Sequence, residues 1–105
     1  MIKEAGLIFG GVLNEQSRAK PRHKLFLPTT MLVGAEKFRV HLLDLSASGA
    51  QVHFTIPPPL GALVQIECAG ALRMARVARR DGERFGIQFL TPLRNIEIEQ
   101  VTSQR

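Results

Sequence analysis

The feature that most constrains the fold is a series of short segments in which apolar and polar residues alternate. Alternation with a period of two is typical of a β-strand with one buried face. Turn-forming residues separate these segments at intervals of roughly ten residues, and no long helical pattern interrupts them. The six segments are residues 25–33, 38–42, 50–56, 64–68, 72–77 and 85–89. A chain of 105 residues closes a small barrel more easily than it fills two separate sheets, so the sequence predicts an all-β fold, a six-stranded antiparallel β-barrel.

Irregularities in the alternation predict where the strands bend and turn. The apolar phase slips at Leu43, which indicates a β-bulge or a strand end. In the fifth segment Leu72, Met74 and Val77 are expected to mark the core face, with a second phase slip and with arginines displayed along the strand. The Asp-Gly pair at residues 81–82 predicts a hairpin with a type I′ turn, which requires positive φ at both central positions.

The charge of the chain favours an anionic partner. The formal net charge is +5 and the pI about 10.4, which suits a nucleotide, a nucleic acid or a membrane surface. Cys68 is the only cysteine, so neither an internal disulfide nor a cysteine metal cluster can form. Its apolar surroundings predict a buried thiol, consistent with a reducing cytoplasm. The apolar run at residues 5–13 is too short to span a membrane, so no membrane insertion is expected.

The two ends of the chain lack a clear strand pattern. Residues 1–17 are expected to form a flexible lead-in, and residues 18–24 carry four cations and no acid. Pro21 disfavours the helical conformation for the residue before it, so this basic stretch is expected to be an irregular arm of a barrel domain that spans residues 18–92. Residues 93–105 are expected to form a tail or a short C-terminal helix, because Thr-Pro at residues 91–92 is a plausible helix start.

The segment at residues 44–49, Asp-Leu-Ser-Ala-Ser-Gly, lies where one predicted strand ends and another begins. On an extended backbone Asp44 and Ser46 project to the same face. Gly49 permits positive φ or the close approach of a ligand. By itself the segment is typical of an Asx or Ser turn between strands.

Two arginines upstream change this interpretation. Arg18 and Arg22 precede Asp44 in the sequence, and a guanidinium fork matches both a phosphate and the O6/N7 edge of guanine. The carboxylate of Asp44 can accept hydrogen bonds from the N1–H and N2–H edge of the same kind of base. The three side chains therefore form a complementary set for a guanine nucleotide.

This arrangement resembles the PilZ domain of bacterial cyclic di-GMP receptors. Arg18 and Arg22 match the family's arginine pair, and Asp44, Ser46 and Gly49 match its Asp/Asn-x-Ser-x-x-Gly motif. Residues 85–89, Phe-Gly-Ile-Gln-Phe, are similar to the family's final strand, and the resemblance covers about residues 17–92.

The resemblance implies a six-stranded antiparallel barrel that binds cyclic di-GMP, a dianion with two guanines, and no other cofactor. Arg18 and Arg22 would wrap the ligand, Asp44 and Ser46 would bind it from the barrel surface, and Gly49 would shape the turn. An effector protein, unidentified from the sequence, would receive the signal. Serine just before Arg18 leaves open whether one ligand or a stacked pair binds.

The sequence leaves three alternatives to this function. A PilZ-like adaptor could bind a protein through the basic strand at residues 73–84, although those arginines also suit a solvated barrel face. A nucleic-acid-binding barrel is disfavoured, because four of the six phenylalanines follow core-facing alternation and leave few aromatic rings for base stacking. Catalysis is not expected, since the three histidines are scattered and Ser46 has no base nearby in the sequence.

Overall fold

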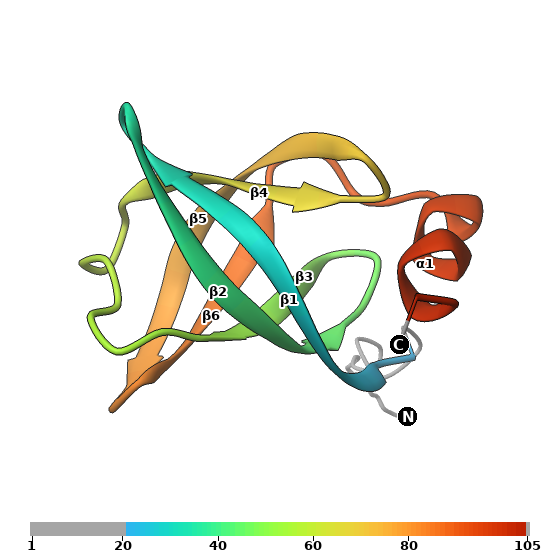
Figure 1. The fold of residues 1–105 in the computed structure, drawn as a ribbon, viewed down its shortest axis with the longest axis horizontal. Coiled ribbons are helices and arrows are strands. Elements are labelled where there is room, and N and C mark those ends of the chain that lie inside the picture. The colour runs from blue at the N-terminus through green and yellow to red at the C-terminus, as the bar shows by residue number, and fades with distance from the viewer. Residues whose placement is uncertain (1–20, 105) are drawn as a thin grey trace, which may run out of the picture.

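The computed structural model describes residues 21–104, so the predictions for the lead-in at residues 1–17 and for Arg18 lie outside the described residues. Six strands form one closed antiparallel barrel in the order β1-β2-β3-β6-β5-β4, and a short helix follows (Figure 1). This confirms the predicted six-stranded antiparallel β-barrel and the C-terminal helix. The elements are β1 (His23–Val33), β2 (Glu36–Leu45), β3 (Gly49–His53), β4 (Leu63–Cys68), β5 (Ala71–Asp81), β6 (Arg84–Phe89) and α1 (Asn95–Thr102).

The core lies inside the barrel and consists of every second residue of each strand, as the period of two predicts. Phe85 and Phe89 are buried, and the rings of Phe38 and Phe54 pack against each other with centroids 5.2 Å apart. The predicted burial of Cys68 is confirmed. The largest fully buried aliphatic side chains are Met31, Val40, Leu42, Leu45, Val52, Val64, Ile66, Val77 and Val101.

The β5–β6 turn differs from the prediction in position and type. Asp81 pairs with Arg84, so the two loop residues are Gly82 and Glu83 rather than Asp81 and Gly82. Only Gly82 has positive φ, at 63°, which fits a type II′ turn because that turn places glycine first. Positive φ at both central positions occurs instead at residues 69–70, between β4 and β5.

The predicted core face of β5 was wrong for two of its three residues. Leu72 and Met74 are 46% and 39% exposed, whereas Ala75 and Val77 are buried. The inward phase includes Arg73, whose guanidinium forms an ion pair with Glu97 of α1. A charged residue can face inward because the helix supplies a carboxylate at that end of the barrel, and the register irregularity comes later, between Val77 and Arg79.

Two strand ends also depart from simple alternation. The predicted bulge near Leu43 is confirmed by a register shift between Leu42 and Asp44 in the β2–β3 pairing. The strand expected to continue to Ile56 ends at His53, and Ile56 is exposed. The three prolines that follow cannot donate ladder hydrogen bonds, so the chain leaves the sheet before reaching them.

Helix α1 closes one end of the barrel. Its Ile98 and Val101 are buried, and Leu93 ahead of the helix joins the same core. Glu97 accepts a hydrogen bond from the backbone N–H of Arg94 at 2.8 Å, which satisfies a donor at the helix start. Across residues 21–104, no helix has the length and apolar character needed to cross a membrane.

Candidate ligand-binding site

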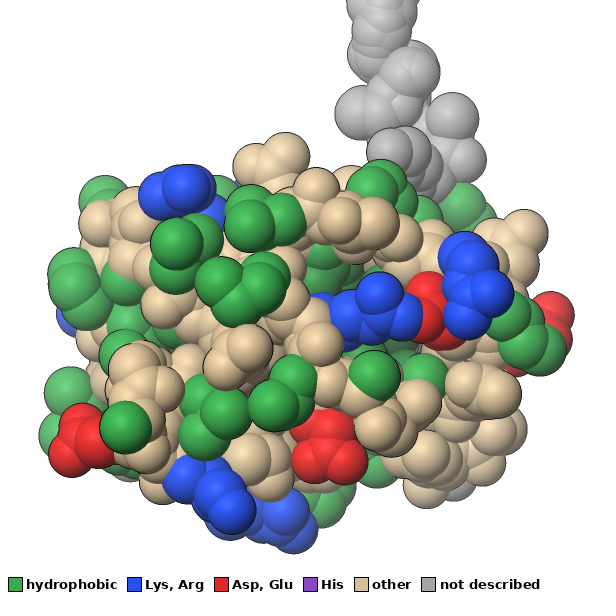
Figure 2. Space-filling model, turned by 90° about the horizontal axis from the view of Figure 1, so that it is seen from above, with side chains coloured by type: hydrophobic (Ala, Val, Ile, Leu, Met, Phe, Trp, Pro, Cys, Tyr) green, Lys and Arg blue, Asp and Glu red, His purple; other side chains and the backbone are tan. Residues whose placement is uncertain are grey.

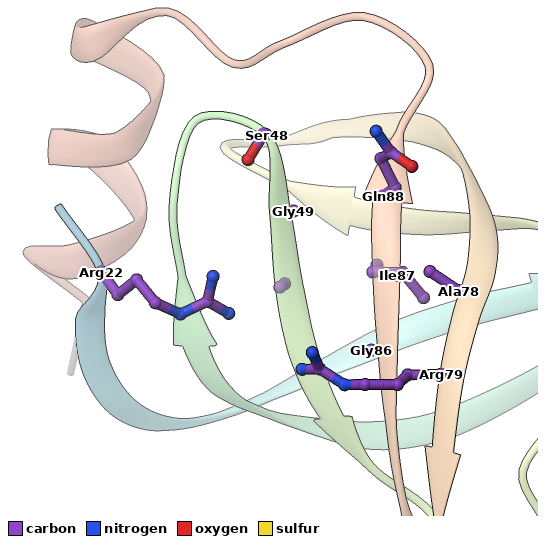
Figure 3. A pocket seen from close by; sticks show the side chains of 9 residues that line it. Arg22, Ser48, Gly49, Ala78, Arg79, Gly86, Ile87 and Gln88 are labelled. Carbon is purple, nitrogen blue, oxygen red and sulfur yellow. The ribbon is translucent and has the colours of Figure 1, made fainter. Parts of the chain in front are cut away.

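A cleft of about 230 Å³ lies on the outer face of the barrel, across β3, β6 and β5. Figure 3 shows its residues: Arg22 enters from the start of the described chain, and Arg79 enters from β5 on the opposite side. Between them, Gly49 of β3 and Gly86 of β6 place no side chains on the floor of the cleft, and both glycines are buried. Ser48 and Gln88 line the rim.

The structure brings Asp44 into contact with Arg22, which lines this cleft, although Asp44 itself is not among the lining residues. Arg22 Nη2 lies 2.6 Å from Asp44 Oδ1, although 22 positions separate the residues. The pairing of β1 with β2 explains the contact, because Lys24 lies opposite Asp44 and places Arg22 beside the carboxylate. The side chain of Asp44 is 8% exposed, whereas that of Arg22 is 49% exposed. A charge-assisted hydrogen bond of this length is strong.

Ser46 does not project outward as the extended backbone suggested. It is 1% exposed, and its hydroxyl donates to the carbonyl oxygen of Gly49 at 3.3 Å. The backbone N–H of Ser46 donates to the same oxygen at 2.8 Å. The hydroxyl therefore holds the β2–β3 turn, and the neighbouring Ser48 presents its side chain to the cleft.

Gly49 is required by strand packing. A Cβ atom at this position would lie 2.3 Å from the carbonyl oxygen of Ile87 on β6, far inside van der Waals contact. Gly49 is not among the described residues with positive φ. Positive φ, one of the two reasons expected for this glycine, therefore does not apply. The close approach of the β6 backbone, which was not among the expected reasons, requires glycine here.

Sequence reasoning missed Arg79 and Gln88 as residues of the cleft. The arginines of β5 suited a solvated barrel face, and nothing local distinguished Arg79 from its neighbours. One signal was present, because a glycine inside a strand often marks a close approach of other groups. Gly86 is such a glycine, and it pairs with Arg79 across the β5–β6 ladder.

The chemistry of the cleft suits a planar anion with hydrogen-bonding edges. Two guanidinium groups offer donors and positive charge, Asp44 offers an acceptor beside one of them, and Ser48 and Gln88 add neutral polar groups. Nowhere in the described part of the chain do three or more His, Cys, Asp or Glu side chains gather as a metal site would require.

Comparison with known proteins is consistent with this geometry. The family model described as the PilZ domain matches residues 16–104, which is nearly the whole chain. A search of curated proteins found no match to the sequence. Because the family match covers the barrel, the cleft and the helix, the chain belongs to the PilZ domain family, a family of binding domains for cyclic di-GMP.

Proposed function

We propose that this protein is a cyclic di-GMP receptor in which the ligand is clamped between the arginine arm and the barrel surface. Arg18 and Arg22 form the arm, and Asp44, Ser46 and Gly49 belong to the barrel. The observation that carries the proposal is the contact of Arg22, which lines the cleft, with the carboxylate of Asp44. Two residues far apart in sequence thus meet where a guanine nucleotide could engage both.

Each residue has a distinct part in the proposed clamp. Arg22 uses one nitrogen on Asp44, and its remaining N–H groups are suited to a phosphate or to the O6/N7 edge of guanine. The carboxylate of Asp44 accepts from the N1–H and N2–H edge. Ser46 acts through the turn that it holds, and Gly49 through the close packing that keeps the floor flat.

Calorimetric titration of the full chain with cyclic di-GMP tests the proposal. A sub- to low-micromolar Kd is expected, which corresponds to roughly 8 kcal/mol. Arg22→Ala should weaken binding by about 10- to 100-fold, the loss expected for one bidentate arginine contact. Lys37→Ala on the exposed face of β2 removes the same charge away from the cleft and is the matched control. An absence of binding heat from a protein that melts cooperatively would refute the receptor function.

Competition experiments separate a receptor from a general anion-binding surface. GTP and single-stranded DNA should compete with cyclic di-GMP only weakly, because neither presents two guanines and two phosphates in one compact ring. Equal affinity for all three ligands would contradict specific recognition.

Exposed apolar side chains favour a protein partner as a second element of function. Leu63, Leu72, Met74 and Leu90 are large, exposed and hydrophobic, and the Leu90 N–H bonds to the Met74 carbonyl at 3.0 Å. Figure 2 views the barrel from above Figure 1 and shows hydrophobic side chains exposed on that face. An effector protein that receives the signal should bind this domain in a cyclic di-GMP-dependent manner. Binding that persists unchanged in Arg22→Ala would instead favour an adaptor.

A further inference from the structure

The arginines of β5 differ in how they are used by the fold. Arg73 forms an ion pair with Glu97, Arg76 donates to the carbonyl oxygen of Gly61 at 2.9 Å, and Arg80 donates to that of Pro57 at 3.4 Å. The guanidinium of Arg79 makes no hydrogen bond or ion pair with any other residue in the range 21–104. The one β5 arginine without such a contact is the one that lines the cleft.

The side chain of Arg79 lies across Gly86 with one flat face against the strand. A Cβ atom at Gly86 would be 3.3 Å from Arg79 Nη2 and 3.5 Å from both Cζ and Nε. Because this Cβ position is almost equally far from three atoms of the guanidinium, it lies over the flat face of the group and not beside its edge. Gly86 is buried although it lies on the outer face of β6, because the guanidinium covers it.

The opposite face of the same guanidinium borders the cleft. In Figure 3 the side chains of Arg22 and Arg79 extend toward each other from opposite sides, above the backbone of β3 and β6. Gly49 contributes no side chain between the two arginines, and Gly86 lies beneath the Arg79 guanidinium. The guanidinium face turned away from Gly86 belongs to an exposed side chain and is suited to stacking with a planar base.

We propose that Arg79 is a third ligand-binding arginine, whose exposed guanidinium face stacks with one guanine base of cyclic di-GMP. This inference rests on the proposed function of the cleft. Arg22 and Asp44 bind from one side through hydrogen-bonding edges, and Arg79 binds from the other side through its plane. Stacking needs the planar guanidinium, so a lysine, which carries the same charge on a compact ammonium, cannot replace it.

The test is calorimetric titration of the full chain and three variants with cyclic di-GMP. Arg79→Ala should weaken binding about tenfold, as expected for the loss of a stacked base, and Arg79→Lys should weaken it to a similar extent. Arg84→Ala is the control, because Arg84 is an exposed cation on neighbouring β6 outside the cleft. Its affinity should stay within about twofold of wild type. Thermal melts of all four proteins should agree, since the Arg79 side chain has no hydrogen bond or ion pair within the described fold to lose.

The outcomes distinguish this inference from the function on which it rests. If wild type binds and Arg79→Ala binds as well as Arg84→Ala does, the third arginine is refuted while the receptor function stands. If Arg79→Lys binds like wild type, charge is sufficient and stacking is refuted. If wild type itself gives no binding heat, the receptor function is refuted and this inference with it.

Discussion

The ion pair between Arg22 and Asp44 should respond very differently to removal of each partner in the ligand-free protein. Arg22→Ala leaves a carboxylate whose side chain is only 8% exposed without the partner seen here. An unpaired, largely buried charge destabilises a fold by about 1–3 kcal/mol or more. Loss of the arginine also admits some water to Asp44, so we expect the free energy of unfolding to fall by about 1–2 kcal/mol. This corresponds to a decrease in Tm of about 5–15 °C for a domain of this size.

Asp44→Asn should have a much smaller effect. The amide oxygen can still accept a hydrogen bond from Arg22, and a guanidinium that is 49% exposed recovers solvation from water. The change in the free energy of unfolding should therefore stay within about 0.5 kcal/mol. In the double variant, Arg22→Ala with Asp44→Asn, no unpaired carboxylate remains. Most of the stability lost in Arg22→Ala should therefore return.

Thermal denaturation followed by circular dichroism at neutral pH, without ligand, measures all three variants. Arg84→Ala serves as the control for loss of one cation from the surface. The reasoning is refuted if Asp44→Asn destabilises the protein as much as Arg22→Ala does, or if the double variant is no more stable than Arg22→Ala.

Three further predictions concern the barrel and its helix. Glu97→Gln should lower the free energy of unfolding by about 2 kcal/mol in urea titrations, because the partly exposed guanidinium of Arg73 loses its anionic partner. The control is Glu99→Gln on the exposed side of α1, which should change the free energy of unfolding by less than about 0.5 kcal/mol. Burial raises the pKa of Cys68 from 9.0 to about 11, so the unfolded chain releases this proton at lower pH than the folded protein. Stability should therefore fall by up to about 2–3 kcal/mol as the pH rises from 9 to 11, and Cys68→Ala should reduce that fall. Ala69→Asn should raise Tm by several degrees. Ala69 has a φ of 54°, a left-handed conformation that costs alanine about 1 kcal/mol and suits asparagine better. A lower Tm in the variant would contradict this reasoning.

The fold was predictable because its signals are local. Alternation of period two and turn residues between segments mark six strands, and short antiparallel strands in a small chain close into a barrel. The failures arose where a distant residue decides the outcome. Arg73 occupies an inward position because Glu97 of α1 forms an ion pair with it. Strand β6 lies between these two elements in the sequence, so the local pattern of β5 does not reveal the contact. Leu72 and Met74 were consequently assigned to the wrong face.

The candidate site was predictable to a smaller extent. The sequence predicted that Arg22 and Asp44 belong to one ligand site, and the structure brings the two side chains into contact. It gave no indication that Ser46 is buried in its turn. Arg79 was missed because its role in the cleft depends on the β5–β6 register, in which Gly86 lies opposite it. Such cross-strand neighbours follow from strand order in the barrel, which composition and spacing do not specify.

The close approach of Gly49 to Ile87 has a consequence for how relatives of this protein should diverge. If the proposed site is right, a relative that binds no nucleotide would be free to replace Arg22 and Asp44, especially if both changed together. It could not easily replace Gly49, since any side chain there would meet the carbonyl oxygen of Ile87. Persistence of this glycine in a related sequence would therefore report selection on strand packing, and the arginine and aspartate positions would be the ones that reveal whether ligand binding survives.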